Sequence, residues 1–119
     1  MNVSLSSGGY RIIANDSVFL FDDSEELIIK VTEGDAFDIC VIIKFANDET
    51  GERSITRKVE DDNLILVCNN FNGAGTGMTK PMYIADINGK KVYLTIWAYL
   101  EGSKTPKVRS VKYTLFYEQ

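Results

Sequence analysis

Carboxylate side chains gather in two short polar stretches, and a pair of carboxylates is the catalytic equipment of most glycoside hydrolases. The candidates for such a pair are Asp22, Asp23, Glu25, Glu26, Asp61 and Asp62. The same oxygen atoms would suit calcium, which takes about six to eight oxygen ligands in proteins. Neither stretch, DDSEE or EDDN, has the spacing of a known calcium loop, and both have the composition of solvated turns. We therefore expect turns at both places.

Histidine is absent from the chain, and cysteine occurs only as Cys40 and Cys68. A Ser-His-Asp or Cys-His arrangement is therefore excluded, and four thiolate or imidazole ligands for a structural zinc ion cannot be assembled. Both cysteines sit in apolar runs, DICVII and ILVCNN, where a thiol behaves as a small hydrophobic group. We expect two reduced, partly buried thiols, no catalytic residue, no metal site and no cofactor.

A polar, glycine-rich stretch covers residues 69–80 and reads NNFNGAGTGMTK. Its glycines are too close together for a phosphate loop, and no helix is predicted to follow them. Long loops in compact domains often carry function, so we expect a loop that contacts a partner. The contact residues would be Asn69, Asn70, Phe71, Asn72, Thr76 and Lys80. The alternative is a plain connection between two sheets.

An alternating run at residues 92–100 carries aromatic side chains on one of its two faces. Val92, Leu94, Ile96, Ala98 and Leu100 share one face, and Tyr93, Thr95, Trp97 and Tyr99 share the other. One face must meet the core, and the aromatic face is either covered by another segment or exposed. An exposed Tyr93, Trp97 and Tyr99 patch would suit a protein partner or a sugar. The alternative is that Trp97 is buried in the core of the sandwich, and the sequence leaves both interpretations open.

The net charge of −4 argues against nucleic acid as the main partner. Residues 1–78 carry 6 basic and 14 acidic groups, whereas residues 79–119 carry 7 and 3. This asymmetry is either ordinary mixed surface charge or a dipolar surface that orients a partner. No segment has the apolar length of a signal peptide or a membrane span, so we expect a cytoplasmic protein without a membrane partner.

Alternation of polar and apolar residues recurs along nearly the whole chain and predicts strands. The expected strands cover residues 10–14, 17–21, 27–31, 36–46, 54–59, 64–68, the hairpin 82–100, and 108–117. Asn15-Asp16, a turn-prone pair, is expected to separate the first two of these strands. The hairpin signal Asn88-Gly89 would place Ile87 opposite Lys90, Ala85 opposite Val92 and Tyr83 opposite Leu94. This pattern predicts one domain over residues 1–119, an antiparallel, immunoglobulin-like β-sandwich of about eight strands.

Four stretches resemble a family of small bacterial proteins known as a domain of unknown function. They are NDSVFLFDD at 15–23, LILVCNNFNGAGTG at 64–77, NGKKVYL at 88–94 and VKYTLFYE at 111–118. The resemblance covers most of the chain and implies a bacterial or phage source and a stand-alone β-domain. It implies no catalytic residues.

These observations together predict a small, non-enzymatic, cytosolic binding protein. It would engage a protein partner through the 69–80 loop and an aromatic sheet face. The alternative is a carbohydrate- or calcium-binding β-sandwich module, and a carboxylate-based hydrolase is a third possibility. The oligomeric state stays open, because the final strand could form a sheet edge on which Lys112 discourages pairing.

Overall fold

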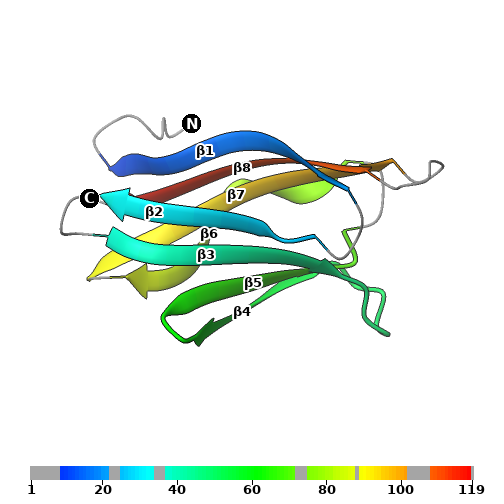
Figure 1. The fold of residues 1–119 in the computed structure, drawn as a ribbon, viewed down its shortest axis with the longest axis horizontal. Coiled ribbons are helices and arrows are strands. Elements are labelled where there is room, and N and C mark those ends of the chain that lie inside the picture. The colour runs from blue at the N-terminus through cyan, green and yellow to red at the C-terminus, as the bar shows by residue number, and fades with distance from the viewer. Residues whose placement is uncertain are drawn as a thin grey trace.

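The computed structural model describes residues 9–21, 25–33, 37–71, 75–87, 89–101 and 108–118, which form eight strands and contain no helix. The strands are β1 (Tyr10–Phe21), β2 (Leu27–Glu33), β3 (Phe37–Ala46), β4 (Ser54–Glu60), β5 (Asn63–Asn69), β6 (Thr76–Ile87), β7 (Lys90–Glu101) and β8 (Val108–Glu118). They form two four-stranded sheets that lie as two layers (Figure 1). The all-β prediction is therefore confirmed.

The first sheet, here called sheet A, has the strand order β1-β8-β7-β6, and every neighbouring pair in it is antiparallel. The final strand β8 thus lies inside a sheet, so its predicted place at an edge is wrong. The strand β1 runs without a break through Asn15 and Asp16, which pair with Thr114 and Tyr113. A polar pair need not end a strand whose outer face meets solvent, and the irregularity falls earlier, between Ile12 and Ala14.

The second sheet, sheet B, has the order β2-β3-β5-β4. Its pair β3–β5 is parallel, which corrects the prediction of a wholly antiparallel fold. The chain leaves β3, forms β4 at the edge and returns as β5 between them, so two reversals restore the direction of β3. The order has a hydrophobic reason: β5 (NLILVCN) is apolar on both faces, whereas β4 (SITRKVE) is polar and mostly exposed.

The hairpin of β6 and β7 follows the predicted register only near its turn. Ile87 pairs with Lys90, and Ala85 pairs with Val92, as expected. The register shifts between Tyr83 and Ala85, so Tyr83 lies opposite Tyr93 rather than Leu94. This shift places Tyr83 on the same face as the aromatic residues of β7.

The core lies between the sheets and is built from one face of each alternating strand. Its members include Val41, Ile43 and Phe45 of β3, Val92, Leu94, Ile96 and Ala98 of β7, and Val111, Tyr113, Leu115 and Tyr117 of β8. Cys40 and Cys68 are both free, and Cys68 belongs to this core. On one side of the molecule, the Arg57 guanidinium of β4 lies 5.6 Å from the centre of the Tyr83 ring of β6, which links the two sheets.

Candidate functional site

The stretch expected to be a contact loop at 69–80 is mostly strand. Asn69 is the last residue of β5, and β6 already begins at Thr76, so the connection is about half as long as predicted. Lys80 lies on β6 with an exposed side chain, and Asn72 lies outside the described residues. The loop prediction fails because glycine and threonine in this stretch continue an edge strand rather than interrupt it.

Asn70 is a buried clamp rather than a contact residue. It is 7% exposed, its backbone has φ +63°, and its N–H donates to the Ala46 carbonyl at 2.7 Å. Its side-chain Nδ2 donates to Asp48 Oδ1 at 2.7 Å and to the Glu52 carbonyl at 2.8 Å. The Asp48 N–H donates back to Asn70 Oδ1 at 3.2 Å. Asn70 therefore fixes the β3–β4 turn to the end of β5.

Phe71 is part of the core, with 1% of its surface exposed. Its ring makes an edge contact with Phe45, and its carbonyl accepts a hydrogen bond from Arg109 Nη1. The guanidinium of Arg109, itself buried, lies 4.3 Å from the centre of the Phe45 ring. Asn69 is also buried and donates weakly to Ser54 Oγ at 3.4 Å. The first three residues of the expected contact loop therefore stabilise the fold. The Phe71 ring packs in the core, and the side-chain amides of Asn69 and Asn70 donate hydrogen bonds within the protein.

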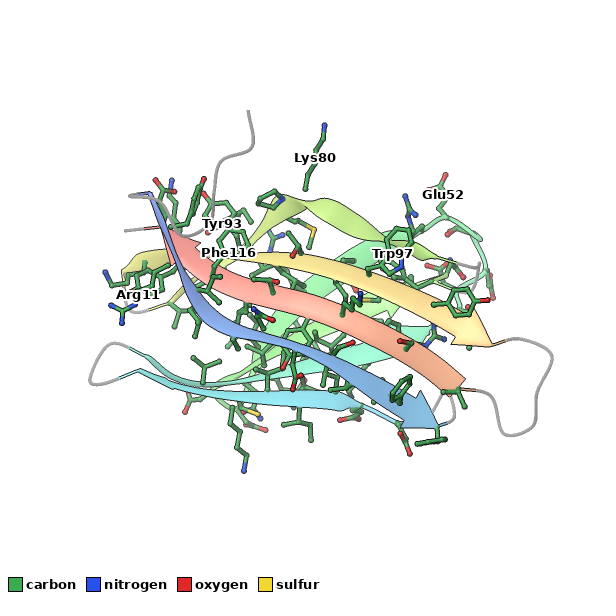
Figure 2. All side chains as sticks on the ribbon, turned by 90° about the horizontal axis from the view of Figure 1, so that it is seen from above. Arg11, Glu52, Lys80, Tyr93, Trp97 and Phe116 are labelled. Atoms are coloured by element: carbon green, nitrogen blue, oxygen red, sulfur yellow. The ribbon has the colours of Figure 1, made fainter. Side chains whose placement is uncertain are left out.

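The aromatic face of β7 is the outer face of sheet A, pointing away from sheet B. Trp97 and Tyr99 are each 42% exposed there, which decides between the two interpretations left open by the sequence. Tyr93 lies at the other end of the same face, and Figure 2 shows it beside Phe116 with Trp97 farther along β7. The three residues therefore share a face without forming one patch.

Tyr93 belongs to an aromatic cluster that covers one end of the outer face. Its ring stacks on Phe116 with centroids 5.7 Å apart, and meets Tyr10 and Tyr83 edge to face at 5.6 and 5.9 Å. Its hydroxyl donates to Glu118 Oε2 at 2.9 Å, and this bond, more than burial, raises the pKa of Tyr93. The cluster buries Phe116 on an outward-facing position, so its role is structural.

Trp97 is exposed, yet its ring packs on one side against Gly75, which directly precedes β6. A Cβ atom added at Gly75 would come within 2.6 Å of the indole Cζ2. Gly77 pairs with Trp97, and a Cβ there would lie 2.2 Å from the Ile96 carbonyl oxygen. Gly75 has φ +70°, which also favours glycine. Gly75 therefore lets the indole pack against the backbone just before β6, and Gly77 lets the backbones of β6 and β7 approach closely.

Beside Trp97, an open trough of about 570 Å³ crosses three strands of sheet A. Its lining consists of Asn15, Asp16 and Ser17 of β1, Thr95, Ile96 and Trp97 of β7, and Lys112, Tyr113 and Thr114 of β8. No residue of sheet B lines it, so it lies on the outer face. The middle residues of two triplets, Ile96 and Tyr113, are buried and point inward, whereas Asp16 is exposed and its Oδ1 accepts a hydrogen bond from the Ser17 N–H at 2.8 Å. The other six side chains face the trough.

Two transverse rows of paired residues build this trough. Ser17 lies opposite Lys112, which lies opposite Trp97; Asn15 lies opposite Thr114, which lies opposite Thr95. In the described part of the chain, no hydrogen bond or ion pair engages the polar side chains of these rows. The trough therefore offers one amide, three hydroxyls and one ammonium group beside an indole ring.

Comparison with known proteins places the chain in a family. Residues 4–118 match the model of a family described as a domain of unknown function, DUF6864. The chain belongs to the DUF6864 family. The resemblance drawn from the four sequence stretches is therefore confirmed at the level of an uncharacterised family. A search of curated proteins and a search of solved structures each return no match to this DUF6864 domain.

The acidic residues of the DUF6864 domain do not converge where they are described. Glu25 Oε2 accepts a hydrogen bond from the Phe21 N–H at 2.7 Å, and Glu26 pairs with Lys44 at 3.4 Å. Asp61 and Asp62 form the exposed turn before β5, whereas Lys44 lies opposite Val67 near the end of β5. The turn of Asp61 and Asp62 is therefore on the order of 15 Å along β5 from the Glu26–Lys44 ion pair. Asp22 and Asp23 lie outside the described residues.

The described residues of the domain contain neither a candidate metal centre nor a membrane-crossing helix. No group of three or more histidine, cysteine, aspartate or glutamate side chains is arranged to hold a metal ion in these ranges. Within the same ranges, no helix has the length and apolar character needed to cross a membrane.

Sequence reasoning did not single out most of the trough residues of this DUF6864 domain. The sequence predicts Asn15 in a turn, and no local pattern brings Ser17 together with Lys112 and Thr114. The available signal was the alternation of the final strand, which puts Lys112 and Thr114 on one face. What joins them to Asn15 and Ser17 is the β1–β8 pairing, which spans almost the whole chain.

Proposed function

We propose that this DUF6864 domain is a non-enzymatic binding module whose binding surface is the outer face of sheet A, centred on Trp97. The observation that carries the proposal is the combination found at this residue. Trp97 is 42% exposed, its indole ring packs against Gly75, and it borders an open trough. Exposed tryptophan held in one orientation loses little conformational entropy on binding, which is why such residues anchor interfaces.

In this proposal the binding surface is the outer face of sheet A rather than the 69–80 loop that the sequence suggested. Asn69, Asn70 and Phe71 are buried, so a partner that meets the folded domain reaches little of them. Trp97 and Tyr99 stay in the proposal, and Tyr93 supports the surface from within its aromatic cluster.

Two kinds of partner fit this face, as the sequence suggested. A protein partner is supported by Phe19, which is 66% exposed and lies in one transverse row with Ser110 and Tyr99. A carbohydrate is supported by the polar trough beside Trp97. Nothing in the described residues supports the calcium alternative, since they hold no group of three metal-binding side chains.

The immunoglobulin-like topology stays a proposal about the fold. Two packed four-stranded sheets support it, and the parallel pair β3–β5 counts against it, since immunoglobulin sheets are antiparallel.

The proposed function is tested by capture on immobilised protein. The wild type, Trp97→Ala and Ile28→Ala are compared, since Ile28 is 54% exposed on the outer face of sheet B and serves as the matched control. Each column receives lysate of the source organism, and eluates are analysed for proteins by mass spectrometry and for polysaccharide by monosaccharide composition. Thermal melting establishes that the wild type and both variants are folded.

The proposal expects one protein or one polysaccharide to be retained by the wild type and Ile28→Ala and lost with Trp97→Ala. Equal retention on all three columns, or no retention on any, contradicts it.

A further inference from the structure

We infer that the trough beside Trp97 is an oligosaccharide-binding site, an inference that rests on the proposed function of this face and names its ligand class. Its six facing side chains are Asn15, Ser17, Thr95, Trp97, Lys112 and Thr114. They come from three neighbouring strands of one sheet, so their spacing is set by backbone pairing rather than by a flexible loop.

The trough pairs an aromatic platform with groups that hydrogen-bond in both directions. A sugar ring has an apolar face of C–H groups and a rim of hydroxyls, and an indole ring buries the C–H face. Hydroxyl and amide side chains both donate and accept hydrogen bonds, as sugar hydroxyls do. The polar side chains of Asn15, Ser17, Thr95 and Thr114 have no partner within the described residues, so each can serve a ligand.

The position of the polar groups favours a saccharide over a protein. A protein interface places apolar anchors at its centre and polar groups at its rim. Here the hydroxyl and amide groups surround Trp97 in the middle of the face, between the Tyr93 cluster and the exposed Phe19 and Tyr99, so among the described residues a single indole is the only apolar anchor there. A protein covering this face would bury a row of small polar side chains, and it would have to supply a hydrogen-bond partner for each of them.

The charge and size of the trough agree with this ligand class. Lys112 is the one charged side chain among the six, so the trough lacks the several cations that a nucleic-acid backbone requires. The volume of about 570 Å³ falls in the range of small-ligand sites. Three strands span roughly 10 Å, so the trough suits a short oligosaccharide lying across the strands.

Trp97 is the only tryptophan in the chain, so its fluorescence reports on this site alone. The full-length protein is titrated with cello-, malto-, xylo- and chito-oligosaccharides and with the polysaccharide fraction of the source organism. We expect at least one of these probes to shift the tryptophan emission to shorter wavelength in a saturable way. Since the ligand is held by hydrogen bonds and stacking, raising the salt concentration leaves the affinity for a neutral probe unchanged.

The double variant Asn15→Ala/Thr114→Ala removes two hydrogen-bonding groups without touching the indole. It should weaken the affinity about tenfold or more while the emission of the free protein stays as in the wild type. Thr56→Ala, at an exposed threonine on the outer face of sheet B, is the matched control and should bind as the wild type does.

The outcomes separate this inference from the proposed function. If no probe changes the emission, but Trp97→Ala abolishes capture of a protein, the ligand class is wrong and the binding face stands. If no probe acts and no capture depends on Trp97, both are wrong. An emission change that survives unaltered in the double variant places the sugar on the indole alone and overturns the trough as its site.

Discussion

Replacing Asn70 with alanine tests whether the polar end of β5 is a structural clamp. This residue is 7% exposed, has φ +63°, and its side chain makes three hydrogen bonds to the β3–β4 turn. A contact residue would show the opposite behaviour, with a loss of binding and little change in stability. The two roles are therefore separable by a measurement of unfolding.

The expected magnitude follows from these contacts. Each side-chain hydrogen bond contributes roughly 0.5–1.5 kcal/mol net, so losing three costs about 2–4 kcal/mol. Alanine in the left-handed region adds about 1–2 kcal/mol. We expect Asn70→Ala to lower the free energy of unfolding by about 3–6 kcal/mol, a large part of the roughly 5–15 kcal/mol that holds a domain folded. The melting temperature should fall by roughly 10–20 °C.

The assay is urea denaturation followed by far-UV circular dichroism, with two comparison variants. Asn70→Gly loses the same hydrogen bonds without the left-handed penalty, so it should be the more stable of the two by up to about 1 kcal/mol. Asn69→Ala removes a neighbouring amide whose single side-chain bond to Ser54 is long, at 3.4 Å, and should cost about 1 kcal/mol or less.

The pH dependence gives a second readout of the same clamp. Hydrogen bonds from the side chains of Thr50 and Asn70 hold the pKa of Asp48 below its ordinary value. Because the unfolded state then binds the proton first, this contribution to stability is present above the ordinary pKa and is lost as the pH falls. Asn70→Ala removes one of the two donors, so its stability should decline less than that of the wild type between roughly pH 5 and pH 3.

An Asn70→Ala variant whose free energy of unfolding lies within about 0.5 kcal/mol of the wild type would refute this reasoning. So would a variant in which alanine is tolerated better than glycine, because the left-handed backbone would then impose no cost.

Three further predictions concern close packing and burial. Gly75→Ala should lower the free energy of unfolding more than Gly51→Ala does, and it should shift the tryptophan emission. Both glycines have φ +70°, but only a Cβ atom at position 75 meets the indole. Equal losses of stability without an emission shift would contradict this prediction. Arg109→Met should lower the free energy of unfolding by about 2–4 kcal/mol in urea denaturation, since a buried guanidinium donor and its ring contact are lost; a change below about 0.5 kcal/mol would count against it. Burial raises the pKa of the Cys68 thiol to about 12, so a thiol reagent at mildly alkaline pH should modify only the half-buried Cys40 in the folded protein and both thiols after denaturation.

The candidate site was partly visible in the sequence, and the reason differs from residue to residue. The placement of Trp97 and Tyr99 on one face follows from their spacing, but their exposure does not, because β7 is apolar on one face and aromatic on the other. The prediction of Phe71 as a contact residue is wrong because a neighbourhood of asparagines and glycines is typical of an exposed loop, whereas the ring is buried. Its destination depends on Phe45 and Arg109, which come from β3 and β8.

The sequence alone determined most of the strands of this protein and which side chains share a face on each. Alternation with period two is imposed locally by the pleat, so the two faces of β3, β7 and β8 can be separated from neighbouring residues, although which face of β7 is buried cannot. The same is true of the Ile87–Lys90 turn register, which a two-residue turn sets.

Only the tertiary structure decided which strands meet. The parallel β3–β5 pair and the β1–β8 pair join segments far apart in the chain, and their choice depends on the total burial of the whole assembly rather than on local spacing. The trough exists because that choice brings Asn15 and Ser17 beside Thr114 and Lys112. The packing of Trp97 against Gly75 was also decided only by the tertiary structure, although β6 and β7 form the expected hairpin, because a close approach between two segments leaves no mark in either segment taken by itself.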